Sequence, residues 1–400
     1  MKVLYLSQRF NFKTSGIYAD LINKLVVNGH DVVIVTCDTK DNIKEPLSFE
    51  NGCTVLRVPV PNQFGGNFIK KGLVQLLIEP KMISGIKKYL SDKSFDLVLY
   101  PTPPITFANV VAFCKRKYGC KSYLMLKDIF PQNAIDLGLM KKSGIIYKYF
   151  KIIEKKLYKN SDYIGCMSEA NMKYIKKHQP WIDHNKIELF PNTVDSSKFK
   201  RGKTVGLSKT ELGVPENTTL FLFGGNLSKP QGIDFLLGCL YELREYSEAY
   251  FLIIGSGTEF EKIHSFITEN NLKNVKLLKE VERDRYEMIV NICDVGLILL
   301  DYRFTIPNYP ARTLSYMIQS LPLLAATDVN TDIKELIEEQ AKCGYWCASN
   351  NVTDFVTMVK LLCLDAEKRV TMGLNGRKYF EEHFDVSVSV SILEKHFQVR

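Results

Sequence analysis

Apolar strand patterns alternate with amphipathic helix patterns in two separate series, and this alternation most constrains the fold. The first series opens with a strand at 2–7, a helix pattern at 18–29 and a strand at 30–36. The second begins after a polar stretch at 200–218, which we interpret as a linker with a short helix. Strand-helix-strand units build parallel sheets covered by helices. The sequence therefore predicts an α/β protein of two doubly wound, Rossmann-like domains that face each other across a cleft, with ligands beyond the carboxyl ends of the strands.

The length and composition indicate a globular protein without a membrane span. A chain of 400 residues exceeds what one hydrophobic core usually serves. Its apolar stretches fall short of the roughly 20 residues of a spanning helix, and the N-terminus enters a strand pattern without a cleavage site. We expect a cytosolic protein, or one that rests on the cytosolic side of a membrane. Ten scattered cysteines, without a histidine near Cys343 and Cys347, are typical of reduced core thiols.

Positive charge is concentrated in the first half of the chain. Residues 1–200 carry 31 Lys and Arg against 17 Asp and Glu, whereas residues 201–400 carry 22 against 27. A basic first domain favours an anionic partner such as phospholipid headgroups, a phosphorylated substrate or nucleic acid. Nucleic acid is disfavoured because no zinc finger, aromatic-basic motif or helix-turn-helix spacing accompanies the charge.

Three loops of the second series have the residues of an anion site. The strand that ends in Gly224 and Gly225 leads through Lys229 into a helix pattern. Glycines there let the backbone approach a ligand, and amides at a helix start can bind phosphate oxygens. A turn of the sequence Gly-Ser-Gly at 255–257 follows the next strand. A proline-rich loop then places Arg312 directly before another helix pattern. Lys229 and Arg312 could balance a diphosphate. The alternatives are a tight turn that only closes a corner, an exposed turn lysine and a solvated arginine.

These motifs, in this order, resemble a known family. The segments GGNLSKPQG, GSG and PARTLSYMIQSLP resemble the donor-binding domain of GT-B nucleotide-sugar glycosyltransferases of family 4. In the first half, SGIYADLINKL, PTPP, KDIFPQNAIDLGL and IELFPNTVD resemble its bacterial branch for capsule and O-antigen repeat units. The resemblance covers essentially the whole chain. It implies an acceptor-binding domain at 1–199, a donor-binding domain at 200–380, and a C-terminal helix at 381–400 that packs back on the first domain.

The chain departs from the family pattern at the donor site. Asn226 and Gln231 replace an arginine and a lysine that grip the diphosphate in many members. Pro307 and Ser315 stand where members carry two glutamates, the second of which holds the ribose. We interpret this as a variant site in which Lys229 and Arg312 supply the charge and Ser315 a hydroxyl contact. How the ribose is held stays open.

The resemblance implies roles for further residues. The expected catalytic residues are Asp128, Lys229 and Arg312. The expected donor-binding residues are Gly16, Gly225, Asn226, Gln231, Gly255, Ser256, Gly257, Thr313, Leu314 and Ser315. The expected acceptor-binding residues are Phe10, Tyr18, Phe130 and Gln132.

Asp128 follows an apolar strand pattern, where a carboxylate is costly to bury. By resemblance it orients the acceptor hydroxyl or acts as general base. The alternative is an N-cap for the helix pattern after Pro131. The aromatic rings of Phe10 and Tyr18 could equally belong to the core. His30 stands at a strand start and is interpreted as structural.

No Asp-x-Asp triplet of metal-dependent transferases occurs in the chain. We therefore expect no cofactor, and departure of the nucleotide aided by cations and helix amides.

The segment 144–159 has the pattern of an amphipathic helix with two distinct faces. Its expected apolar stripe is Ile146, Phe150, Ile153 and Leu157, and its lysine face is Lys148, Lys151, Lys155 and Lys159. Such a helix can lie at a membrane interface or simply on the protein surface. A similar mixture at 64–90, with the charge of the first half, favours peripheral attachment to an anionic leaflet.

The resemblance implies a retaining hexosyl- or N-acetylhexosaminyl-type glycosyltransferase. It would move a sugar from a nucleotide donor, expected to be a UDP-sugar, to a polyprenyl-diphosphate-linked saccharide at the inner face of a bacterial membrane. Two alternatives remain: a catalytically inactive, transferase-like binding subunit, and a UDP-sugar epimerase of the same architecture.

Overall fold

The computed structural model describes residues 1–13, 16–43, 45–61, 68–199 and 207–397. The chain forms two compact units, residues 1–195 with 386–400, and residues 196–385. Each unit is described by itself. Within the described residues, no helix combines the length and apolar character needed to cross a bilayer.

Unit 1 contains an eight-stranded sheet of order β3-β4-β2-β1-β5-β6-β7-β8, in which only the β3–β4 pairing is antiparallel. Its strands are β1 Lys2–Leu6, β2 Asp31–Thr39, β3 Leu47–Glu50, β4 Cys53–Val60, β5 Leu97–Thr102, β6 Lys121–Leu126, β7 Tyr163–Cys166 and β8 Ile187–Leu189. Its helices are α1 Ile17–Val27, α2 Phe68–Tyr89, α3 Ala108–Tyr118, α4 Gln132–Asp136, α5 Ile145–Asn160, α6 Glu169–His178 and α13 Val386–Phe397.

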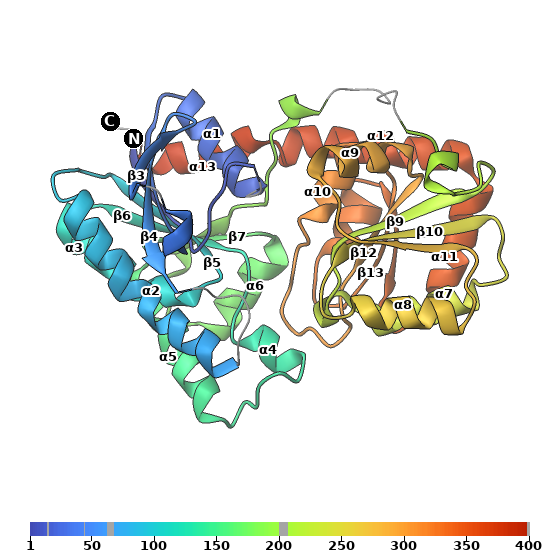
Figure 1. The fold of residues 1–400 in the computed structure, drawn as a ribbon, viewed down its shortest axis with the longest axis horizontal. Coiled ribbons are helices and arrows are strands. Elements are labelled where there is room, and N and C mark those ends of the chain that lie inside the picture. The colour runs from blue at the N-terminus through green and yellow to red at the C-terminus, as the bar shows by residue number, and fades with distance from the viewer. Residues whose placement is uncertain (14–15, 44, 62–67, 200–206, 398–400) are drawn as a thin grey trace. The chain divides into compact units, whose positions relative to one another are not determined.

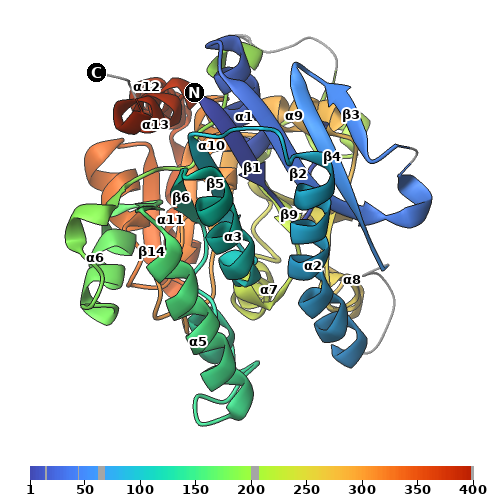
Figure 2. The same ribbon diagram turned by 90° about the vertical axis from the view of Figure 1, so that its left-hand side faces the viewer.

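The central strands β1, β2, β5 and β6 of unit 1 are mostly buried on both faces because helices cover each side (Figure 2), whereas the edge strand β3 is partly exposed. Alternate residues such as Val3 and Tyr5 of β1 pack with α1 and α13 in one core cluster. The opposite face is covered by α2 and α3. Since β2 and β5 flank β1 on opposite sides, the order of the parallel strands changes direction between β1 and β5. This is the switch point at which doubly wound sheets bind ligands.

Unit 2 contains a six-stranded, wholly parallel sheet of order β11-β10-β9-β12-β13-β14 (Figure 1). Its strands are β9 Thr219–Asn226, β10 Ala249–Ser256, β11 Val275–Leu278, β12 Val295–Leu299, β13 Leu323–Thr327 and β14 Gly344–Ala348. Its helices are α7 Ile233–Glu242, α8 Phe260–Glu269, α9 Arg283–Ile292, α10 Arg312–Met317, α11 Val352–Leu364 and α12 Ala366–His383. The switch point lies between β9 and β12.

The C-terminal helix α13 belongs to unit 1, where Ser389 lies 2.8 Å from Thr193 between their hydroxyl oxygens. The unit boundaries fall at Asp195 and Asp385 rather than at the predicted 199 and 380. The second boundary is later because α12 continues to His383, and the Phe384 ring packs against Tyr309 of unit 2 at 6.0 Å. Of the predicted linker, residues 200–206 lie outside the described residues, and Thr210–Leu212 form one 3₁₀ turn.

Candidate active site

The glycine pair of unit 2 lies at the carboxyl end of β9, directly at the switch point. A Cβ atom on Gly224 would lie 2.1 Å from the Tyr286 hydroxyl oxygen, and one on Gly225 would lie 3.5 Å from Arg312 Nη2. A Cβ atom on Gly255 would lie 1.8 Å from the Gly225 carbonyl oxygen. Because the three glycines lack a Cβ atom, the turns after β9 and β10 lie close together at this edge of the sheet. The side chains of Tyr286 and Arg312 can approach the same edge.

Arg312 begins α10, which follows the loop after β12. Its Nη2 donates a hydrogen bond of 2.6 Å to Gln231 Oε1, and its Cζ lies 4.5 Å from the centroid of the Phe223 ring. Nη1 is inaccessible and has no hydrogen-bond partner among the described residues. Burial lowers the pKa of Arg312, while the phenols of Tyr316 and Tyr286 act in the opposite direction. Arginine nevertheless stays charged, so this edge holds a positive charge that lacks a carboxylate partner among the described side chains.

Tyr286 and Tyr316 support this arrangement and escaped the sequence analysis. The buried Tyr316 hydroxyl accepts a hydrogen bond from Gly224 N at 3.2 Å and donates one to Leu222 O at 3.3 Å. Tyr286 packs beneath Gly224. Both aromatic rings appear in the sequence as ordinary helix residues, and no spacing signals their contact with the end of β9.

Lys229 lies in the 3₁₀ turn Lys229–Gln231 that follows the glycine pair. The bond from Arg312 to Gln231 brings the arginine to this turn, which carries Lys229 as an exposed side chain. Asn226 is also exposed, at the last position of β9. The structure thus places Arg312 in hydrogen-bond contact with Gln231 and beside Gly225, with Lys229 on the turn of Gln231 and Asn226 at the end of β9.

The turn at 255–257 lies beside the glycine pair, since Gly255 pairs with Gly225 and Ser256 with Asn226 in the β9–β10 register. Gly257 is exposed, and a Cβ atom there would lie 2.2 Å from the Leu227 carbonyl oxygen. The exposed Ser256 hydroxyl donates a hydrogen bond of 2.6 Å to Glu280 Oε2.

The first turn of α10 contains Thr313 and Leu314, two of the predicted donor-binding residues. Thr313 and Leu314 are fully buried, and their amides donate to Pro310 O and Ala311 O, each at 3.1 Å. The backbone amides of both residues are therefore engaged within the start of the helix, whereas the buried Thr313 hydroxyl has no hydrogen-bond partner among the described residues. Their predicted contact with a donor stays a prediction. The half-buried Ser315 is one residue further along the same helix.

Asp128 lies just beyond β6 in unit 1. Its Oδ2 accepts a hydrogen bond of 2.6 Å from Asn133 Nδ2. The helix α4 begins after Pro131 without a side-chain cap, so the N-cap alternative for Asp128 is wrong. Burial raises the pKa of Asp128 to about 6, and hydrogen bonds from Ile129 and Asn133 oppose this increase. A carboxylate with this pKa can accept a proton near neutral pH.

Tyr18 lies in the first turn of α1 and is influenced by the charge of Asp128. Burial raises the pKa of its phenol, and the charge of Asp128 adds to this effect. Gly16 precedes α1 with φ of 49°, a conformation that favours glycine. Phe10, in contrast, is buried between Tyr5 and Phe12, with ring centroids 5.6 and 4.9 Å away. The alternative that Phe10 is a core residue is the one that the structure supports.

Phe130 and Gln132 have partners within unit 1. The Phe130 ring packs edge-on against Phe150 of α5 at 4.9 Å, and Gln132 Nε2 donates to Asp136 Oδ1 at 2.8 Å. Neither side chain touches Asp128 through a described hydrogen bond. Both side chains are half-buried, and their predicted contact with an acceptor stays a prediction.

Lys127 was missed, although it precedes Asp128. Its Nζ donates to the carbonyl oxygens of Phe190 and Pro191 at 3.2 and 3.3 Å. Burial lowers the pKa of Lys127 to about 7. A cavity of about 10 Å³ beside it, partly lined by Tyr18, is large enough for about one water molecule.

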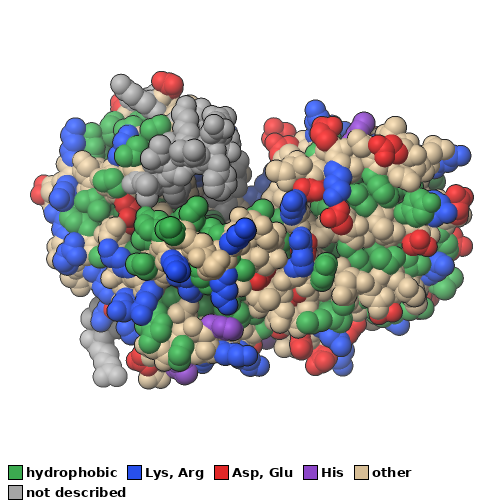
Figure 3. Space-filling view, turned by 90° about the horizontal axis from the view of Figure 1, so that it is seen from below, with side chains coloured by type: hydrophobic (Ala, Val, Ile, Leu, Met, Phe, Trp, Pro, Cys, Tyr) green, Lys and Arg blue, Asp and Glu red, His purple; other side chains and the backbone are tan. Residues whose placement is uncertain are grey.

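The face of α5 differs from its prediction. Leu157 is buried and Phe150 and Ile153 are half-buried, but Ile146 is 60% exposed. A second apolar stripe is exposed at Ile145, Tyr149 and Ile152, with Ile145 86% and Ile152 67% exposed. Figure 3, seen from the end toward which α5 points in Figure 1, shows lysine and arginine among hydrophobic side chains on unit 1. Of the other predicted interfacial segment, the side chains of 62–76 lie outside the description.

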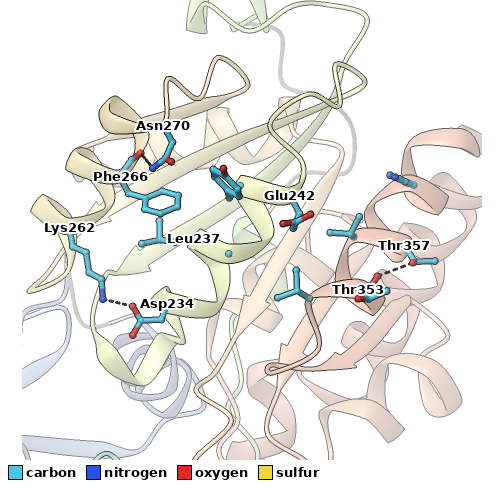
Figure 4. Close-up of a pocket in the computed structure, with 13 residues that line it drawn as sticks. Asp234, Leu237, Glu242, Lys262, Phe266, Asn270, Thr353 and Thr357 are labelled. Atoms are coloured by element: carbon cyan, nitrogen blue, oxygen red, sulfur yellow. Dashed lines mark hydrogen bonds and ion pairs between the residues drawn. The ribbon is translucent and has the colours of Figure 1, made fainter.

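A separate pocket of about 1030 Å³ opens between α7, α8 and α11 of unit 2 (Figure 4). Leu237, Phe266 and the ion pair of Asp234 with Lys262 are among its lining residues. No predicted site residue lines it. It is therefore distinct from the edge of the unit 2 sheet around Gly224, Gly225 and Gly255, which we call the glycine edge.

Two Rossmann-like units with mainly parallel sheets form the architecture of GT-B glycosyltransferases. Residues 17–198 match the model described as Glycosyltransferase Family 4, and residues 207–379 match that described as Glycosyl transferases group 1. The chain belongs to these glycosyltransferases and is a transferase. The predicted family and fold class are confirmed.

Three similar proteins agree with this assignment. The probable glycosyltransferase WbjE of Pseudomonas aeruginosa is 22% identical over 82% of this chain and 80% of its own length. The putative colanic acid biosynthesis glycosyl transferase WcaI of Escherichia coli is 20% identical over 84% and 86%. The structure of Anabaena HepE in complex with UDP and glucose has a TM-score of 0.72 at 15% identity, covering 100% of both chains.

Among the described residues, no group of three or more His, Cys, Asp and Glu side chains is placed to hold a metal ion. The ten cysteines are free, and nine are buried.

Proposed function

We propose that unit 2 binds a nucleoside diphosphate sugar, in particular a UDP-sugar, through the glycine edge around Arg312. The observation that carries this proposal is the charge of Arg312, held against Gly225 at the switch point without a carboxylate partner among the described residues. A diphosphate would supply the missing negative charge, and a guanidinium suits its oxygens. The HepE complex with UDP and glucose supports the same ligand class.

We further propose that the reaction proceeds with retention and without a metal ion. The bond between the anomeric carbon and the β-phosphate oxygen breaks, and the acceptor oxygen bonds to that carbon. Arg312 and Lys229 stabilise the departing nucleoside diphosphate. The acceptor proton passes to the carboxylate of Asp128, whose pKa of about 6 keeps it mostly ionised at neutral pH.

The acceptor in this proposal is a polyprenyl-diphosphate-linked saccharide of a surface polysaccharide. The name of WcaI, which refers to colanic acid biosynthesis, supports this acceptor class. Unit 1 would rest on the anionic inner leaflet through α5. The exposed Ile145 and Ile152 next to exposed lysines such as Lys148 support this attachment, because apolar burial and electrostatic attraction add.

The donor proposal is tested by titrating UDP, GDP and dTDP into the protein by calorimetry. Wild type should bind a nucleoside diphosphate, and Arg312→Ala should weaken that binding by about tenfold or more, since hydrogen bonds to charged groups contribute about 1.5–3 kcal/mol. The matched control is Arg283→Ala, an exposed arginine of α9 paired with Glu287, which should leave binding unchanged. Equal affinity of Arg312→Ala and wild type would refute the role of Arg312.

The catalytic proposal requires a different signature. Asp128→Asn should bind the nucleotide as wild type does and lose most of its turnover. Loss of nucleotide affinity with intact turnover would reverse the assigned roles of the two units.

A further inference from the structure

The ribose of the proposed donor needs a partner on the edge of the unit 2 sheet. A carboxylate is well suited to a ribose diol, because each oxygen can accept a hydrogen bond from a hydroxyl. The helix α10, however, has the sequence RTLSYM and carries no carboxylate. Any carboxylate that holds the ribose must come from elsewhere.

Three carboxylates lie within two residues of the end of a strand in this sheet: Glu280 after β11, Asp301 after β12 and Asp328 after β13. Asp301 is buried and receives both Nε and Nη2 of Arg303, at 2.8 and 2.7 Å. Its charge and both oxygens are therefore already engaged.

Asp328 is also engaged and enclosed. It is 1% exposed, and its Oδ1 accepts hydrogen bonds from the amides of Asn330 and Thr331 at 2.8 and 3.1 Å. It shapes the loop after β13 and is inaccessible to a ligand.

Glu280 differs from both. It is exposed, and its described hydrogen bond is the one that it accepts from the Ser256 hydroxyl. An ionised carboxylate has about four lone-pair sites, so most of its capacity remains available. The hydrogen bond from Ser256 restricts the Glu280 side chain and keeps its carboxylate at the edge of the sheet.

The register of β9 and β10 places the Glu280 carboxylate close to the proposed diphosphate site at Gly225 and Arg312. Ser256 pairs with Asn226, the residue after Gly225, so Ser256 is one strand spacing of about 4.8 Å from the end of β9. Glu280 Oε2 lies 2.6 Å from Ser256 Oγ. In the proposed arrangement the phosphates of the nucleotide lie against Arg312 and Gly225, and the nucleoside extends over β10. The ribose, which follows the α-phosphate, then lies beside Glu280.

We propose that Glu280, positioned by Ser256, binds the ribose hydroxyls of the donor nucleotide. The inference rests on the proposed function of unit 2. It replaces the missing carboxylate of α10 by one from the opposite side of the glycine edge, across β9 and β10. Ser256, predicted to contact the donor, acts in this arrangement by orienting Glu280.

The test compares UDP with 2′-deoxy-UDP and 3′-deoxy-UDP, by calorimetry, in wild type, Glu280→Ala, Glu280→Gln and Glu282→Gln. Wild type should bind UDP about tenfold more tightly than either deoxy analogue, the effect of losing one charge-assisted hydrogen bond. Glu280→Ala, which removes the partner of both hydroxyls, should weaken UDP by more than tenfold, up to about a hundredfold, and reduce the ratio between UDP and the analogues to near one. Glu280→Gln, which keeps one acceptor oxygen, should show an intermediate ratio. Glu282, an exposed glutamate of the same loop, is the matched control and should retain the wild-type ratio.

The outcomes separate this inference from the donor proposal. If wild type binds none of the nucleoside diphosphates, the donor proposal fails. If wild type binds UDP and its deoxy analogues equally, or if Glu280→Ala keeps the full ratio with unchanged thermal unfolding, nucleotide binding stands and the role of Glu280 is overturned.

Discussion

The ionised carboxylate of Asp128 should lower the stability of the protein near neutral pH. Its pKa is about 6 in the folded protein against an ordinary value of 3.8, mainly because of burial. At about 1.36 kcal/mol per pKa unit, this difference corresponds to roughly 3 kcal/mol. Since the folded state binds the proton more tightly, stability falls as pH rises from about 4 to about 6 and then stays low. Asparagine is neutral throughout this range.

Asp128→Asn should therefore raise the free energy of unfolding above pH 6 by up to about 3 kcal/mol and change it little at pH 4. Urea unfolding at pH 4.5 and pH 8, followed by tryptophan fluorescence and circular dichroism, measures the difference. The control is Asp92→Asn, an exposed carboxylate of unit 1. Turnover of wild type should rise through pH 6, and the variant should lack this limb. If the stability of the variant relative to wild type is no greater at pH 8 than at pH 4.5, the electrostatic account of Asp128 is refuted.

Two further predictions concern the glycine edge and α5. Gly255→Ala places a Cβ atom 1.8 Å from Gly225 O, so it should lower the free energy of unfolding by about 1–3 kcal/mol and weaken UDP binding in calorimetry. Gly238→Ala, whose Cβ atom has its nearest neighbour at 3.8 Å, should be tolerated, and equal losses in both variants would contradict the close approach. Ile152→Glu should reduce sedimentation with phosphatidylglycerol vesicles severalfold, because it removes apolar area and adds repulsion. Val370→Glu, at a 62% exposed site of α12, is its control, and undiminished binding of Ile152→Glu would exclude α5 as the contact.

The architecture was predictable because it depends on patterns that are local in the sequence. Strand patterns at 219–225 and 249–257 correspond to β9 and β10, and the helix pattern at 18–29 corresponds to α1. Each pattern follows from burial on one or both faces of an element. The unit boundary at Asp385 was less predictable, since α12 continues to His383 and Phe384 still packs against Tyr309 of unit 2, whereas the next helix, α13, belongs to unit 1.

The site was predictable only in part, because its geometry depends on contacts between distant segments. The glycine turn and Arg312 were both found, but their bond through Gln231 joins residues 81 positions apart. The substitution of a family lysine by Gln231 gains a physical meaning from this bond, since a neutral amide can accept from a guanidinium whereas an ammonium would repel it. For Phe10 the same limitation led to a role in ligand contact, although its ring is enclosed by Tyr5 and Phe12.

The neutral partner also lets Arg312 keep its position in the absence of a ligand. Two cations against the same glycine turn would repel each other in the absence of a diphosphate, and burial would increase that repulsion. With Gln231 as its partner, Arg312 can stay in place before the ligand arrives, held by Oε1 and by the Phe223 ring. Such preorganisation lowers the cost of binding, because the guanidinium need not be ordered when the diphosphate enters. In the proposed function, one half-buried, prepositioned arginine, with an exposed lysine on the turn that it contacts, takes the place of a pair of cations.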